Sequence, residues 1–193
     1  MSPNVSRRTK LLAAAGMILT TIIWGSAFVV MKNSVDVIPP TYLLALRFTL
    51  AAIGLGILFF PLVRRTPRSD FKCGAVLGFW LFVSYFFQTY GLKYTTASKN
   101  AFITTLYVIL VPFINWGINR LRPGKNNLFA AVAAVIGLAL ITLEGDLGVN
   151  RGDVLTLFCS ISFSLHMVFI ARYTKDHVPT LMTFFQMAVS AAL

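Results

Sequence analysis

The chain has 193 residues, of which 57% are hydrophobic and only 12% are charged, and its mean hydropathy is +0.77. A soluble domain carries about 25% charged residues, so this composition excludes a water-soluble globular protein and predicts an integral membrane protein. The net charge of +11 does not indicate nucleic-acid binding, because the basic residues stand in short clusters between apolar runs and not on one soluble face.

The apolar runs predict an all-α, multi-pass helical bundle. A helix needs about 20 apolar residues to cross about 30 Å of hydrocarbon. Such runs lie at 11–31, 41–63, 73–92, 100–118, 128–143 and 154–171, and a seventh begins at 180–193. We expect the first run to be retained and not cleaved as a signal peptide, because it is too long for an ordinary signal sequence and no small-x-small cleavage site follows it.

The basic residues alternate between the two sides of the predicted bundle. Twelve of the 17 lysines and arginines lie before the first span or after the second, fourth and sixth. Four lie on the other side, and Arg47 lies inside the second span. By the positive-inside rule, the basic N-terminal segment 1–10 and the loop 64–72 are cytoplasmic, and the segment 144–153 is outside. The expected location is the cell (inner) membrane.

A weak internal repeat joins the start of the second span to the start of the seventh. At a spacing of 139 residues, Pro40 falls on Pro179, Thr41 on Thr180 and Arg47 on Gln186. Five spans separate the two copies, so the second copy has the opposite orientation. Inverted-topology repeats build many secondary transporters, which bind substrate near the bilayer midplane. We therefore expect helices one and six to be related by a pseudo-twofold axis.

The last apolar run, 180–193, is short for a span. On hydropathy we expect a chain truncated inside helix seven, and the alternative is a complete short protein whose last segment is interfacial.

Several short motifs in fixed order resemble one transporter family. They are WGSAF at 24–28, PP at 39–40 with ALRF at 45–48, YGLKYTTAS at 90–98 leading into AFITTLYVILVP at 101–112, and Gly152-Asp153. Together they resemble the EamA branch of the drug/metabolite transporter superfamily over nearly the whole chain.

The resemblance implies a ten-helix transporter of two five-helix repeats with both ends in the cytoplasm. This chain would supply the first EamA repeat at 11–143, and 144–193 would be the start of the second, with helix six and an incomplete helix seven. The implied activity is alternating-access transport of small metabolites, with export of amino acids or related compounds.

Arg47 is the most informative candidate site residue, because an ionisable side chain inside a span is costly and usually functional. It lies roughly 10 Å below the outer end of its span. Either it is a cavity charge that attracts an anionic group or pairs with a carboxylate, or it is a structural arginine that reaches the interface or bonds to helix ends. No carboxylate lies within the predicted spans, and Glu144 is expected to be solvated at the end of the fifth.

Polar and aromatic side chains on shared helix faces extend the candidate substrate site. Besides Arg47, the predicted site contains Trp24, Tyr85, Gln88, Asn100, Thr104, Tyr107 and His166. Any one of them is explained by helix packing, but the set favours a cavity lining, because several polar groups facing lipid would be costly. For His166, a hydrogen-bonded packing role is favoured over a proton relay. Small residues suit close packing, namely Gly25, Ser26, Gly54, Gly56 and Gly137.

The sequence gives no indication of an enzyme. The HExxH and GxSxG motifs are absent, and Cys73 and Cys159 are far apart without CxxC spacing, so we expect neither a cofactor nor a metal site. The expected partners are a small-molecule substrate and the lipid bilayer, with self-assembly as a homodimer left open. The competing interpretations are a non-transporting fragment of such a transporter and, less favoured, an integral membrane enzyme.

Overall fold

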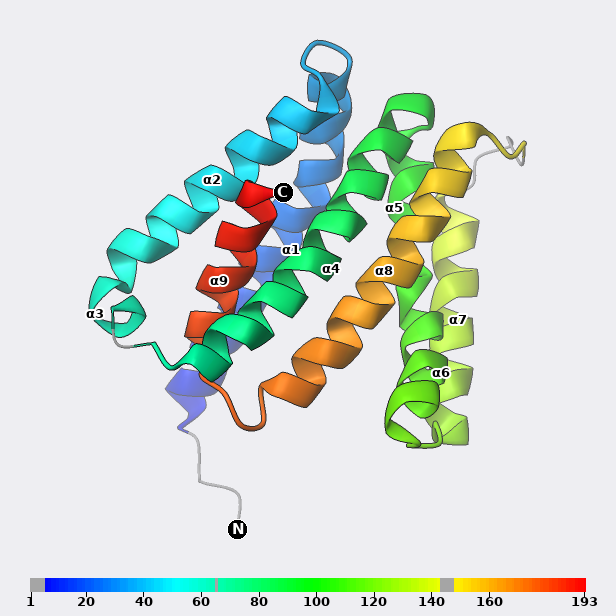
Figure 1. Ribbon diagram of the computed structural model, residues 1–193. Helices are drawn as coiled ribbons and strands as arrows, with labels where there is room; N and C mark the ends of the chain where they lie inside the picture. Colours follow the sequence, from blue (N-terminus) through cyan, green and yellow to red (C-terminus); the bar gives the residue numbers. More distant parts are fainter. Residues whose placement is uncertain (1–5, 65, 143–147) are drawn as a thin grey trace.

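The computed structural model describes residues 6–64, 66–142 and 148–193, and these ranges are built from helices (Figure 1). The helices are α1 Arg7–Val35, α2 Pro40–Leu58, α3 Phe60–Val63, α4 Arg68–Tyr94, α5 Ala97–Thr105, α6 Tyr107–Asn119, α7 Lys125–Thr142, α8 Arg151–Tyr173 and α9 Pro179–Ala192. Among them α1, α2, α4, the consecutive α5 and α6, and α8 are long and apolar enough to cross a membrane. The prediction of an all-α, multi-pass membrane fold is confirmed.

Helix α4 is the centre of the packing, since α8 and α9 both lie along it and α9 also contacts α2 (Figure 1). Glycines allow these close approaches. A Cβ atom on Gly78 would lie 2.8 Å from the Gln186 carbonyl oxygen of α9. A Cβ atom on Gly152 of α8 would collide with the Gly91 carbonyl oxygen of α4. Backbone-to-backbone contact of this kind is how helices associate tightly in a membrane.

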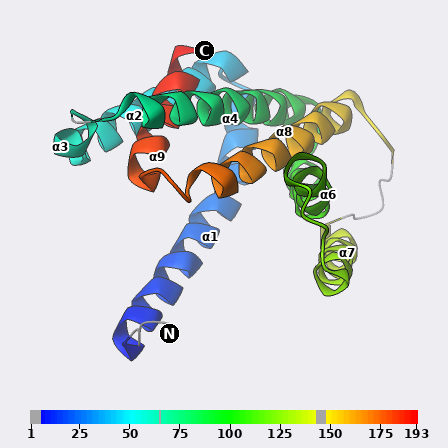
Figure 2. The same cartoon turned by 60° about the horizontal axis from the view of Figure 1, so that its bottom comes forward.

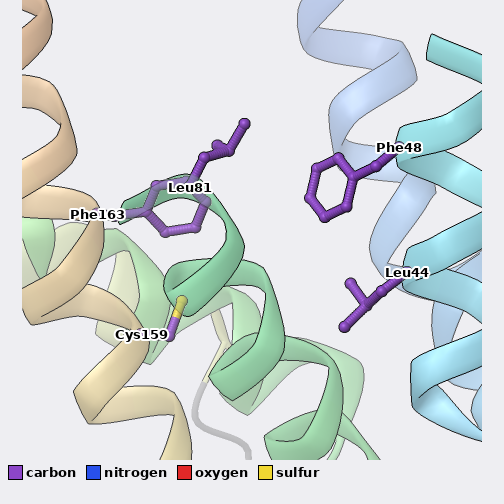
Figure 3. Packing of buried hydrophobic residues seen from close by; sticks show 5 residues of the cluster. All are labelled: Leu44, Phe48, Leu81, Cys159 and Phe163. Atoms are coloured by element: carbon purple, nitrogen blue, oxygen red, sulfur yellow. The ribbon is translucent and has the colours of Figure 1, made fainter. Parts of the chain in front are cut away.

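A small apolar core lies where α2, α4 and α8 meet. Leu44 and Phe48 point from α2 toward Leu81 of α4 and toward Cys159 and Phe163 of α8 (Figure 3). Each of these five side chains is no more than 4% exposed. The core therefore joins α2 and α4 to α8, a helix much later in the chain.

Helix α1 differs from the others because little of it is covered. None of its most apolar 18-residue window is buried. Its N-terminal half leads away from the other helices, as Figure 2 shows, and near its C-terminal end Lys32 Nζ donates to the Leu92 carbonyl oxygen at 3.1 Å. Exposed apolar side chains of this kind suit contact with lipid.

Two predicted spans are interrupted. The second span does not run unbroken to residue 63, because Phe59 leaves the helical region at φ −113° and ψ 22°. Pro61 has no N–H with which to continue the α-helical bonding pattern across this point.

The fourth span begins at Ala97, three residues earlier than predicted, where Thr96 caps the helix by accepting from the Lys99 N–H at 3.1 Å. This span is interrupted at Leu106 by a tighter turn, because the Leu106 N–H donates to the carbonyl oxygen of Ile103, three residues earlier, at 3.1 Å.

The predicted loop 144–153 also ends early, because α8 begins at Arg151. Asn150 and Asp153 form a reciprocal capping box, with the Asp153 N–H donating to Asn150 Oδ1 at 3.0 Å and the Asn150 N–H to Asp153 Oδ2 at 3.0 Å. Asp153 is therefore a buried helix residue and not a loop residue. Glu144, which was expected to be solvated, lies outside the described residues.

The helix directions agree with the predicted repeat. Helices α1 and α2 run in opposite directions to α8 and α9 respectively (Figure 1). Helices α2 and α9 begin at Pro40 and Pro179, the two prolines that the 139-residue spacing overlays. The pseudo-twofold superposition and the division of the chain into two repeats stay predictions.

The glycines expected to provide close packing were mostly the wrong ones. Among the described residues, nothing lies within 4 Å of the Cβ position of Gly25, Gly54 or Gly137, and of the four expected glycines only Gly56 has such a neighbour, the Phe184 ring at 3.1 Å.

Candidate functional site

Arg47 contacts an aromatic side chain of α4. Its Nη2 donates to the Tyr85 hydroxyl oxygen at 3.2 Å, and its Cζ lies 4.3 Å from the centre of the Tyr85 ring. The ring in turn packs edge-on against Phe48 and Phe163 of the apolar core, with centroids 5.5 Å and 5.3 Å away. Among the residues that the structure describes, Arg47 has no carboxylate within ion-pair distance. Within the described part of the chain, the positive charge of Arg47 is therefore contacted by the hydroxyl group and the ring face of Tyr85 and by no carboxylate.

A small cavity beside Arg47 brings together residues of α1, α2 and α4. Its volume is about 10 Å³, which is room for about one water molecule. The lining residues are Trp24, Ala27, Phe28, Met31, Arg47, Gln88, Thr89 and Leu92. Three predicted site residues therefore share one cavity, and Tyr85 holds the arginine at its wall.

Asn100 and Thr104 lie behind Gln88, and neither lines this cavity. Gln88 Nε2 donates to Thr104 Oγ1 at 3.2 Å, and Asn100 Nδ2 donates to the Gln88 carbonyl oxygen at 3.1 Å and to Thr156 Oγ1 at 2.8 Å. Asn100 is fully buried, and its Oδ1 has no hydrogen-bond partner among the described residues. This network joins α4, α5 and α8, so these polar groups position Gln88 from behind.

Tyr107 and His166 lie in other places. Tyr107 lines a separate, open apolar groove of about 530 Å³ between α6, α7 and α8. His166 is 3% exposed and its Nε2 lies 2.9 Å from Oε1 of Gln186, the residue that the repeat overlays on Arg47. The sequence pattern had placed all eight residues in one site, whereas the structure gathers four of them around the cavity and puts two behind it.

A buried ion pair that was not predicted from the sequence connects α4 and α5 to α8. Lys99 Nζ lies 3.8 Å from Asp153 Oδ2 and donates to the Gly148 carbonyl oxygen at 2.8 Å. Thr95 Oγ1 donates to Asp153 Oδ1 at 2.6 Å. The Asn-x-x-Asp spacing of a capping box at 150–153 was the signal that could have placed Asp153 inside a helix.

A second missed cluster lies at the opposite end of α4. His177, in the connection between α8 and α9, places Nδ1 2.6 Å from Asp70 Oδ1 and Nε2 3.3 Å from Cys73 Sγ. A neutral imidazole that donates from Nδ1 has Nε2 free to accept from the thiol. No local spacing reveals a contact between residues 107 positions apart. No group of three His, Cys, Asp or Glu side chains within the described ranges is arranged to hold a metal ion.

The sequence of this chain matches a known protein family. The sequence pattern of the EamA-like transporter family matches residues 11–143, more than two thirds of the chain. The chain belongs to the EamA-like transporter family. The resemblance found in the motifs is thereby confirmed, and the EamA-like chain is a member of a family of transporters.

Curated relatives of the EamA-like chain agree with this assignment. An "Uncharacterized transporter" of Archaeoglobus fulgidus is 36% identical over 177 residues, which cover 92% of this chain and 54% of the relative. The "Uncharacterized transporter YetK" of Bacillus subtilis is 30% identical over 162 residues, covering 82% of this chain and 47% of the relative. The chain thus spans about half the length of the curated relatives it matches.

The fold also has a counterpart among solved structures. One described as "Crystal structure of protein" aligns with a TM-score of 0.63 and 20% identity, covering 90% of this chain and 63% of the other. At this identity the likeness shows a shared fold and nothing about substrate.

Proposed function

We propose that the protein containing this EamA-like chain is a cell-membrane permease that moves a small metabolite by alternating access. Family membership, the apolar helices and the transporter names of its relatives support this proposal. The substrate class is a metabolite with an anionic group and an apolar body, such as an amino acid.

The observation that carries the proposal is that Arg47, beside an aromatic cavity, has no carboxylate partner among the residues the structure describes. A cation inside a span without a carboxylate partner is costly, and an anionic substrate group would offset that cost. The planar guanidinium suits a carboxylate, because it can form two parallel hydrogen bonds. Trp24 and Phe28 offer apolar surface next to it, and Gln88 offers an amide for orientation.

The cavity as described admits about one water molecule, so substrate binds to a different arrangement of the same helices. In that arrangement Arg47 exchanges the Tyr85 hydroxyl for the substrate anion. A ligand that binds one arrangement more tightly shifts the population toward it, which is the minimum requirement for alternating access.

Arg47→Ala in the full-length protein, reconstituted in liposomes, tests this role. A hydrogen bond to a charged group contributes about 1.5–3 kcal/mol, so we expect substrate uptake per molecule to fall about tenfold or more while membrane insertion is intact. Arg47→Lys should retain part of the uptake, because lysine keeps the positive charge but cannot form the two parallel hydrogen bonds of a guanidinium. Lys72→Ala removes an exposed charge elsewhere and is the matched control. If both Arg47 variants only lower protein abundance and leave uptake per molecule unchanged, Arg47 is structural and the substrate role is wrong.

The proposed orientation places the N-terminus and the 64–72 segment in the cytoplasm. It rests on the distribution of basic residues. Single cysteines placed at Arg64 and at Arg151, in a background without Cys73 and Cys159, distinguish the two sides. An impermeant maleimide applied to intact cells should label the cysteine at position 151 and spare the one at 64, and the reverse pattern would invert the topology.

A further inference from the structure

An open apolar groove lies between α2, α3 and α9. Its lining residues are Ala52, Ile53, Gly56, Ile57, Phe60, Val63 and Phe184, and its volume is about 780 Å³. Ligand pockets commonly measure about 300–1,000 Å³. At the break at Phe59, α3 turns away from the axis of α2 (Figure 1), and Phe60 and Val63 of α3 line the groove together with residues of α2.

The α3 end of this groove adjoins a strongly basic segment. Val63 lines the groove, and the next residues of the sequence include Arg64, Arg65, Arg68 and Lys72. Arg64, Arg68 and Lys72 are exposed. The carboxylate of this segment, Asp70, is buried against His177 and so does not neutralise the exposed arginines. An apolar trough that ends at exposed cations matches an amphiphile with a long apolar chain and an anionic head.

We propose that this groove binds an anionic phospholipid, with one acyl chain along α2 and the phosphate against Arg64 and Arg68. Basic residues just outside a membrane span attract anionic lipid headgroups. The lining of the groove is apolar, which suits contact with an acyl chain. This proposal is independent of the transport proposal, since none of its residues lines the Arg47 cavity.

Two features favour a lipid over a second copy of the chain. The small-residue pair Ala52 and Gly56, at the spacing that helices use to pack, is already in use, because the Phe184 ring lies 3.1 Å from the Cβ position of Gly56. In a twofold dimer formed through this face, the same surface patch of each copy faces the other. The basic segments of the two copies would then repel each other.

Trp fluorescence quenching by brominated lipids tests the proposal on the purified full chain. Ile57 is 74% exposed in the groove, so Ile57→Trp is a conservative reporter once Trp24, Trp80 and Trp116 are replaced by Phe. Phe129→Trp is the matched reporter: Phe129 is 77% exposed, follows the basic segment 120–125 and does not line this groove. We expect brominated phosphatidylglycerol to associate at position 57 at least about fivefold more tightly than brominated phosphatidylcholine, with a smaller preference at 129.

Charge variants then assign the headgroup site. Arg64→Gln with Arg68→Gln should remove most of the preference at position 57. Arg8→Gln with Lys10→Gln removes the same charge from the exposed start of α1 and should leave the preference unchanged. Ala52→Phe should weaken quenching by both lipids, because it fills the trough.

Three results would overturn the proposal. Equal association of the two lipids at position 57 would show no anionic site, and an equal loss in both charge pairs would reduce the effect to overall charge. Absent quenching by either lipid, together with disulfide cross-linking of Ile57→Cys between copies, would assign the groove to self-association instead.

Discussion

The two ends of α4 are fastened to their neighbours in different ways. At the end near Thr95, which we call the Asp153 end, glycine backbones touch and a buried ion pair with Lys99 connects three helices. At the start of α4, the Asp70 end, Phe71 packs edge-on against Phe185 of α9, and the polar link is His177, a residue of the short connection between α8 and α9 whose side chain is 19% exposed.

The difference indicates which contact can open. Separation at the Asp153 end would leave a carboxylate and an ammonium group buried without each other, which is strongly unfavourable. Separation at the Asp70 end breaks two bonds of one imidazole at a place that water can reach. We therefore expect α4 and α8 to move together and the α8–α9 connection to part from α4 during any rearrangement that widens the Arg47 cavity.

The largest expected effect is from Asp153→Ala. This change removes the side-chain acceptor of the Asn150 N–H, the partner of Thr95 and the counterion of Lys99, and breaking a buried pair costs about 3–5 kcal/mol. Asp36→Ala is the control, because Asp36 also lies 3.8 Å from a lysine, Lys32, but has a 58% exposed side chain. Exposed pairs contribute at most about 1 kcal/mol. In thermal unfolding in detergent, the unfolding temperature of Asp153→Ala should fall much further than that of Asp36→Ala. Equal decreases would mean that burial of the ion pair at the Asp153 end does not add to stability.

The next effect is from Gly152→Val. The new Cβ atom would meet the Thr95 backbone nitrogen at 2.9 Å and the Tyr94 carbonyl carbon at 2.9 Å, and it would collide with the Gly91 carbonyl oxygen. Backbone atoms cannot rotate away, so we expect a cost of about 1–3 kcal/mol from overpacking. Gly137→Val is the matched control, because open space surrounds that Cβ position on α7. If the control is destabilised as much, helix propensity and not the close approach explains the loss.

Hydropathy was enough to predict the fold class because a span requires a long apolar run regardless of its neighbours. Trp24, Arg47 and Gln88 line one cavity in the structure, whereas spacing within single helices did not show which of the eight predicted residues would meet, and their substrate role stays a prediction. The break at Phe59 was not predictable either, because a proline can also lie inside a helix, as Pro112 does in α6.

The buried carboxylates were not predictable in the same way. Hydropathy assigns a charged residue to a loop, and the burial of Asp70 and Asp153 depends on partners that the fold brings from 107 and 58 positions away. The prediction of which glycines lie at helix contacts failed for a related reason. A glycine is useful where another helix approaches, as at Gly78 and Gly152, and the sequence of one helix does not show which face that is.

The smallest effect on stability, and the sharpest test of the comparison, is from His177→Ala. Asp70 and Cys73 each lose one hydrogen bond, and water can take the place of the His177 imidazole, which is 19% exposed, so the cost should be about 1 kcal/mol and the unfolding temperature should fall only slightly. One kcal/mol is about a fivefold change in the open population. Maleimide labelling of Cys73 in a Cys159→Ser background should therefore accelerate about fivefold.

A cysteine at the other end, introduced as Thr95→Cys, should be labelled slowly with or without His177, because Thr95 is 5% exposed behind the ion pair. Fast labelling at position 95, or no acceleration at Cys73, would mean that the two ends of α4 open alike.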